Sequence, residues 1–106
     1  MITRHATSMA FVICQRHGGH VAPLLCPHLR EAVHAGLPLS EIFYVEAWYL
    51  GDRAWSHHLC PSCAREIGVT DNSTIWKDDE SLDRLMGIRD IAPVCPLCFD
   101  EAKAVA

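Results

Sequence analysis

The sequence has no long apolar run and no cluster of basic residues. No stretch approaches the roughly 20 apolar residues that a membrane-spanning helix needs, and the short run Phe11-Val12-Ile13 is no signal-peptide core. Nine Lys and Arg against 13 Asp and Glu give a formal net charge of −4, which disfavours a nucleic-acid partner. We therefore expect a protein of the reducing cytoplasm, where cysteines bind metal more often than they form disulfides.

Signatures of catalysis are also missing. No P-loop, dinucleotide fingerprint or Ser/His/Asp order is present. Cysteine, in contrast, is abundant, with six residues in a chain of 106, and 50% of the residues are hydrophobic. We expect residues 10–106 to form a single zinc-binding domain and residues 1–9 to form a flexible N-terminal arm.

Two similar motifs, Cys60-Pro61-Ser62-Cys63 and Cys95-Pro96-Leu97-Cys98, dominate the sequence. Two residues between thiols let both sulfurs of a pair face one tetrahedral ion, so the two pairs predict a structural zinc site. Iron can occupy the same thiolate shell. The alternatives are buried free thiols, disulfides, or a redox-active pair, although a redox motif normally occurs once and on a βαβ scaffold.

The N-terminal half holds two further candidate ligand pairs. Cys14 and His17 form a C-x-x-H unit followed by two glycines, and Cys26 and His28 form a C-x-H unit. With these, eight ligands make two tetrahedral sites, for which we expect two zinc ions, and every cysteine is used. The predicted ligands are Cys14, His17, Cys26, His28, Cys60, Cys63, Cys95 and Cys98.

Other histidines compete for these roles. His20 is an alternative to His17, and His57 or His58 could replace a weak ligand. We expect His5 and His34 to face solvent, because no other candidate ligand pairs with them.

The four pairs can combine in two ways. In the sequential arrangement the first two pairs share one ion and the last two share the other. In the cross-braced arrangement the first and third pairs share an ion, as do the second and fourth. Loop-closure entropy favours the sequential arrangement by about 1 kcal/mol per site, so we predict that one.

The pattern of residues predicts an α+β fold of short antiparallel hairpins and short helices. An apolar strand, a ligand pair and a helix recur in that order, which resembles zinc-ribbon or treble-clef construction. Residues 69–75 are expected to be a polar loop. Strands are expected over 10–13, 21–25, 42–50, 54–59 and 88–94, and helices over 26–36, 64–67, 76–87 and 99–105.

The order of the ligand pairs resembles that of RING-type zinc fingers, whose last pair is often C-P-x-C. RING fingers place the third pair directly behind the C-x-H, whereas here a long segment intervenes, so no ubiquitin-ligase activity is carried over. The chain more closely resembles small bacterial zinc-binding proteins of no assigned activity. This resemblance implies zinc binding and rests on His17-Gly18, Cys26-Pro27-His28-Leu29, Cys60 to Cys63, Trp76-Lys77-Asp78 and Cys95 to Cys98.

We therefore expect a non-catalytic structural-zinc protein that binds another protein. Tyr44, Trp48, Tyr49 and Trp55 alternate along two expected strands, so their rings either meet a partner or cover the core. The alternative functions are an enzyme or redox protein acting through the C-P-x-C pairs, and a nucleic-acid-binding ribbon or transcription accessory.

Overall fold

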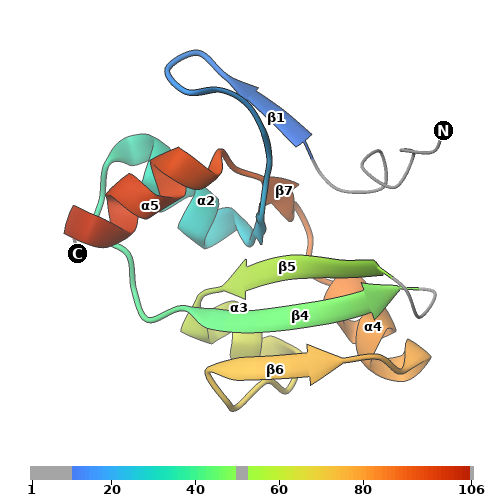
Figure 1. Ribbon diagram of the computed structural model, residues 1–106. Coiled ribbons are helices and arrows are strands. Elements are labelled where there is room, and N and C mark those ends of the chain that lie inside the picture. The colour runs from blue at the N-terminus through green and yellow to red at the C-terminus, as the bar shows by residue number, and fades with distance from the viewer. Residues whose placement is uncertain (1–10, 50–52, 106) are drawn as a thin grey trace, which may run out of the picture.

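The computed structural model describes residues 11–49 and 53–105. The predicted arm over 1–9, His5 and the turn expected at Gly51-Asp52 lie outside these ranges. The described chain has both strands and helices, as an α+β fold requires (Figure 1). Its elements are β1 Phe11–Cys14, β2 Gly18–Val21, β3 Leu24–Leu25, α2 Pro27–Ala35, β4 Phe43–Tyr49, β5 Arg53–Leu59, α3 Pro61–Glu66, β6 Ser73–Trp76, α4 Asp79–Met86, β7 Ala92–Pro93 and α5 Pro96–Val105.

A five-stranded sheet with the order β6-β4-β5-β3-β7 forms the centre of the fold. Its longest pair is the predicted antiparallel hairpin of β4 and β5, in which Val45 lies opposite His57. Side chains alternate between the two faces of a strand. Val45 and Ala47 are fully buried on one face, whereas Tyr44 and Trp48 are half-buried on the other. These two rings are therefore not part of the innermost core.

Three predictions that concern strands needed correction. The loop expected over 69–75 contains most of β6, which pairs parallel with β4, and the helix expected from 76 begins only at Asp79. The strand expected over 21–25 is divided by Pro23 into β2 and β3, and the one expected over 88–94 is reduced to β7. Asp90 has a positive φ of 62°, a conformation that extended strands do not contain. Parallel pairing at a sheet edge joins residues distant in sequence, so local composition did not predict it.

Each Cys-Pro dipeptide begins a helix. Cys26 and Cys60 are the N-cap residues of α2 and α3, with extended backbones, and the following Pro occupies the first helical position. Proline fits there because its φ is already helical and its missing N–H would have no intrahelical partner. α5 likewise begins at Pro96, after Cys95. The helices predicted from 64 and 99 thus begin three residues earlier, on the ligand pairs themselves.

Local capping residues mark the C-terminus of α2 and the N-terminus of α4. α2 stops where Gly36 adopts a left-handed conformation, with φ of 71°. α4 begins where the Asp78 carboxylate accepts a hydrogen bond of 2.8 Å from the backbone N–H of Ser81. None of the helices among the described residues has the length and apolar character needed to span a bilayer.

The core lies between the sheet and its helices. Figure 1 shows α3 and α4 behind the sheet, and α2 beside α5 near β7. Leu25, Leu29, Leu59 and Leu85 are fully or almost fully buried there. No residue of the chain from 11 to 21 belongs to this core.

The β1–β2 hairpin forms a separate two-stranded sheet. Phe11 and Val21 are paired across it, and Ile13 lies two residues along the same face. Their exposed fractions are 59%, 50% and 82%. The Phe11 ring covers Gly19, where a Cβ would come within 2.8 Å of it. No residue from 11 to 21 is fully buried, so burial contributes little to the hairpin's attachment.

Candidate metal centres

The first candidate centre follows from the position of β3 beside β5. These strands are parallel, with Leu25 paired to His58, so the residues that follow them emerge side by side. The Cys26 N–H donates to the His58 carbonyl at 3.0 Å, and the Cys60 N–H donates to the Cys26 sulfur at 3.3 Å. The first turns of α2 and α3 thereby bring together what we call the inner cluster: Cys26, His28, Cys60 and Cys63.

The inner cluster brings four potential metal ligands close together. His28 Nδ1 lies 3.3 Å from both the Cys60 and the Cys63 sulfur, and the four potential ligand atoms all lie within 4.8 Å of one another. The Cys63 N–H also faces the Cys60 sulfur at 3.4 Å. Such N–H groups at a helix N-terminus stabilise thiolates. The three cysteines are buried, whereas His28 is exposed.

The second candidate centre follows from β7, which lies on the other side of β3. β7 is antiparallel to β3, so the residue that follows β7 lies beside the residue that precedes β3. These residues are Val94 and Pro23, and the Val94 N–H donates to the Pro23 carbonyl at 3.1 Å. The start of α5 thus lies near the point where the β1–β2 hairpin joins the sheet (Figure 1). The outer cluster gathers there: Cys14, His17, Cys95 and Cys98.

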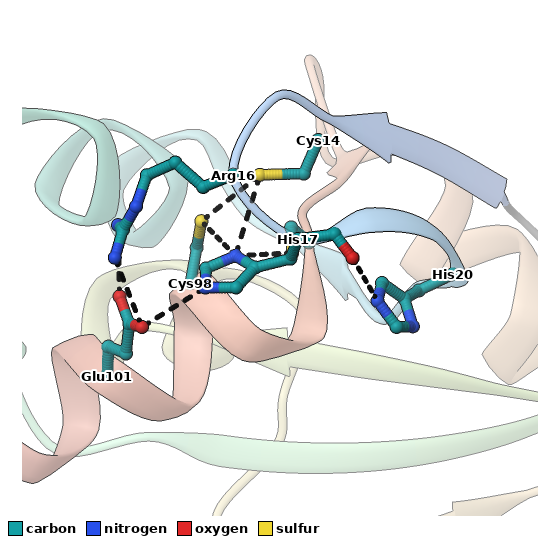
Figure 2. Close-up of polar contacts among 7 residues, drawn as sticks. Cys14, Arg16, His17, His20, Cys98 and Glu101 are labelled. Atoms are coloured by element: carbon teal, nitrogen blue, oxygen red, sulfur yellow. Dashed lines mark hydrogen bonds and ion pairs between the residues drawn. The ribbon is translucent and has the colours of Figure 1, made fainter.

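Distances within the outer cluster suit a tetrahedral metal ion. For zinc, bonds of about 2.3 Å to sulfur and about 2.0 Å to nitrogen give tetrahedral edges of about 3.8 Å between sulfurs and about 3.5 Å between sulfur and nitrogen. The Cys14 and Cys98 sulfurs are 3.7 Å apart. His17 Nδ1 lies 3.6 Å from the Cys14 sulfur and 3.5 Å from those of Cys95 and Cys98. Figure 2 shows His17 pointing toward the sulfurs of Cys14 and Cys98.

The pKa values of the thiols are shifted by backbone hydrogen bonds, by burial and by neighbouring thiols. Backbone N–H groups of Arg16 and His17 lower the pKa of Cys14 to about 6. Burial, followed by the hydrogen bond with Cys14, raises the pKa of Cys98 to about 11. Burial and neighbouring thiols also raise the pKa of Cys63. A divalent cation at either centre would counteract these raised pKa values, because its positive charge stabilises the thiolate form.

Two charged residues near His17, Arg16 and Glu101, were not among the predicted site residues. His17 Nε2 is 3.1 Å from Glu101 Oε2, and Arg16 forms an ion pair with the same carboxylate at 3.1 Å. A signal existed for Glu101, since it follows Cys98 by three residues and shares its side of α5. His20 is not a ligand in either cluster; its Nε2 donates to the His17 carbonyl at 2.8 Å, within the turn.

The remaining candidate histidines lie outside both clusters. His57 and His58 are on β5, and burial lowers the pKa of each to about 4. The His58 ring packs between Tyr44 and Phe99. His34 is exposed, as expected. Neither of these two histidines therefore takes the place of a predicted ligand in the described chain.

The predicted pairing of the ligands is wrong. The first pair meets the fourth and the second meets the third, so the arrangement is nested, neither sequential nor cross-braced. In particular, the two C-P-x-C pairs belong to different clusters and cannot share an ion. Strand order decides the pairing, because β3 lies between β5 and β7. The small entropic preference for short loops is outweighed by hydrogen bonds and burial in the sheet.

Comparisons with known proteins give no family. No protein-family model, curated protein or solved structure matches this chain. The resemblances to RING-type fingers and to small bacterial zinc-binding proteins therefore stay predictions. What stands is a small α+β chain whose eight predicted ligand residues form two clusters that could each hold a metal ion.

Proposed function

We propose that the protein is a non-catalytic module stabilised by two structural zinc ions. The observation that carries the proposal is that each cluster offers four soft ligands, three sulfurs and one imidazole nitrogen, close enough to surround one ion. Zinc favours such tetrahedral sets, and a complete set leaves no open position for substrate or activated water. Thiolate ligands also require a reducing compartment, for which we propose the cytoplasm.

The outer cluster supports a treble-clef style of construction at this end of the chain. Cys14 and His17 lie at the turn of a hairpin, and Cys95 and Cys98 lie in the first turn of a helix. Gly18, with φ of 81°, allows the tight turn after His17. A metal between these two elements would supply the attachment that burial does not, as structural zinc does in other small domains.

We further propose that the module binds another protein. The exposed apolar face of the hairpin, with Phe11, Ile13 and Val21, supports this proposal, because apolar side chains grouped on a surface favour protein contacts. The net charge of −4 argues against a nucleic-acid partner. An Ile13→Asp variant should lose partners that the parent captures, whereas a Leu37→Asp variant, also at an exposed apolar residue, should keep them.

The zinc proposal is tested by counting metal ions and then removing them. Native mass spectrometry should find two zinc ions per chain in protein purified without added metal, and iron in their place would correct the metal. Chelation followed by circular dichroism should show loss of the tertiary signal, since binding and folding are coupled. A chain that carries no metal, or one that keeps its fold after complete chelation, would overturn the proposal.

A further inference from the structure

The surroundings of His17 differ from those of His28, although both present Nδ1 to a cluster. His17 Nε2 faces Glu101 Oε2 at 3.1 Å, on the side of the ring away from the sulfurs (Figure 2). His28 is exposed, and no polar partner for its Nε2 is found among residues 11–49 and 53–105. Within the part of the chain that the structure describes, only the outer cluster therefore has a carboxylate directly behind its imidazole ligand.

This geometry selects one tautomer of His17. A nitrogen that binds metal must offer a lone pair, so metal binding through Nδ1 leaves the proton on Nε2. The Nε2–H then donates to the Glu101 carboxylate. A carboxylate in this position orients the ring and increases the basicity of the ligating nitrogen.

Arg16 limits the freedom of the Glu101 side chain. Its Nη1 lies 3.1 Å from Oε1 and its Nη2 lies 3.3 Å from Oε2, so the guanidinium meets both carboxylate oxygens. Glu101 is 50% exposed and lines a cleft of about 380 Å³ with Arg16 and Cys98, so water competes for its oxygens. An exposed ion pair contributes little stability by itself, but a two-point contact restricts the carboxylate to the rotamer that meets His17.

We propose that Glu101 is a positioning residue for the metal of the outer cluster, and that Arg16 holds Glu101 in place. The proposal deepens the zinc function and depends on it. It assigns the outer cluster a dedicated support, so its metal affinity depends on two side chains that bind no metal themselves. The inner cluster lacks this support and provides an internal reference in the same molecule.

The test compares zinc affinities of the two sites in the full chain at constant pH. Competition with a chromophoric chelator should show that Glu101→Ala weakens the outer site by about 10- to 100-fold, with the inner site unchanged. Glu101→Gln retains an acceptor for the Nε2–H without the charge and should restore part of the affinity. Arg16→Ala should weaken it less than Glu101→Ala. Asp100→Ala is the matched control, because this neighbouring acid on α5 pairs with Lys103 instead.

A spectroscopic measurement separates positioning from general destabilisation. Long-range proton–nitrogen NMR correlations should report the Nε2–H tautomer of His17 in the zinc-loaded parent and in both Glu101 variants. The Nε2–H proton should exchange slowly with water in the parent and in Glu101→Gln, and rapidly in Glu101→Ala, where its acceptor is gone. Outer-site affinity within twofold of the parent in a folded Glu101→Ala protein that binds two zinc ions would overturn the positioning role and leave the zinc function intact. A parent protein that binds no zinc at the outer cluster would instead overturn the function itself.

Discussion

The inner and outer clusters use the same ligand types but occupy different environments. The inner cluster lies where β3 and β5 pass into α2 and α3, and its three cysteines are part of the hydrophobic core or buried against it. In the outer cluster only Cys95 is buried, and Cys14 comes from a hairpin that contributes no residue to the core. The inner cluster is therefore integral to the folded centre, whereas the outer cluster attaches a peripheral element.

This difference shows that the two parts of this 106-residue chain are stabilised in different ways, the central sheet by burial and the hairpin by contacts at its edge. A domain of this size buries enough apolar surface to fold, but with little excess. The three cysteines of the inner cluster belong to the core, so under the zinc proposal loss of the inner metal would leave three neighbouring thiols buried there without a cation. No residue of the hairpin is fully buried and none belongs to the core, so under the zinc proposal its attachment depends on the outer cluster.

The largest expected effect is from breaking the inner cluster. Cys60→Ser removes a ligand and a buried sulfur that accepts the Cys63 N–H. The loss of a structural metal inside the core should exceed about 4–5 kcal/mol, which is comparable to the whole stability of many small domains. We expect no cooperative unfolding transition in urea by circular dichroism.

Ser62→Ala is the matched control for that variant. Ser62 lies between the two ligands of the pair but is exposed and is not a member of the cluster. Its unfolding midpoint should stay near that of the parent. A Cys60→Ser protein that still unfolds cooperatively with one zinc bound would show that the inner metal is dispensable, and the contrast between the clusters would fail.

A smaller and local effect is expected from breaking the outer cluster. Cys14→Ser should release the β1–β2 hairpin, while the sheet and core persist with a loss of about 1–3 kcal/mol, the range of ordinary substitutions. Amide resonances of residues 11–21 should lose their dispersion, and those of β4 and β5 should keep theirs. Cys95→Ser should behave like Cys14→Ser and not like Cys60→Ser, because the nested pairing places Cys95 in the outer cluster. Equal collapse of all three variants would contradict the independence of the clusters.

Much of the site was predictable because metal ligands obey local spacing rules. All four ligand pairs form within one turn or one helix start, where two or three residues decide the geometry. The Cys-Pro dipeptides also carried a local signal for helix beginnings, and three helices begin on them. Arg16 was missed, because a salt bridge across 85 residues leaves no pattern in its own segment. Glu101 was missed although its spacing of three residues from Cys98 placed it on the same side of α5.

The combination of pairs was not predictable, because it depends on strand order. β3 has two residues and β7 also has two, so neither produces a periodic pattern long enough to be recognised. Yet these strands place Cys26 beside Cys60 and Cys95 near the hairpin. Loop-closure arguments compare only the entropy of the unfolded chain, and they contain no information on which strands are neighbours in the sheet.

The smallest expected effect is a pH dependence that belongs to the core around the inner cluster. Burial lowers the pKa of His57 to about 4, whereas an unfolded histidine titrates at about 6.5. The unfolded state therefore binds more protons below pH 6.5, so stability falls as the pH falls through this window toward 4. Between pH 7.5 and 5.5 one such histidine should cost about 1 kcal/mol.

Urea midpoints should show this loss, with mass spectrometry verifying two zinc ions at each pH. His57→Gln should remove only part of the dependence, because burial lowers the pKa of His58 to about 4 as well, and His34→Gln, at an exposed histidine, should leave it unchanged. If His34→Gln removed the slope and His57→Gln did not, the acid sensitivity would belong to the surface near the outer cluster, and the contrast between a buried centre and its attached hairpin would have to be redrawn.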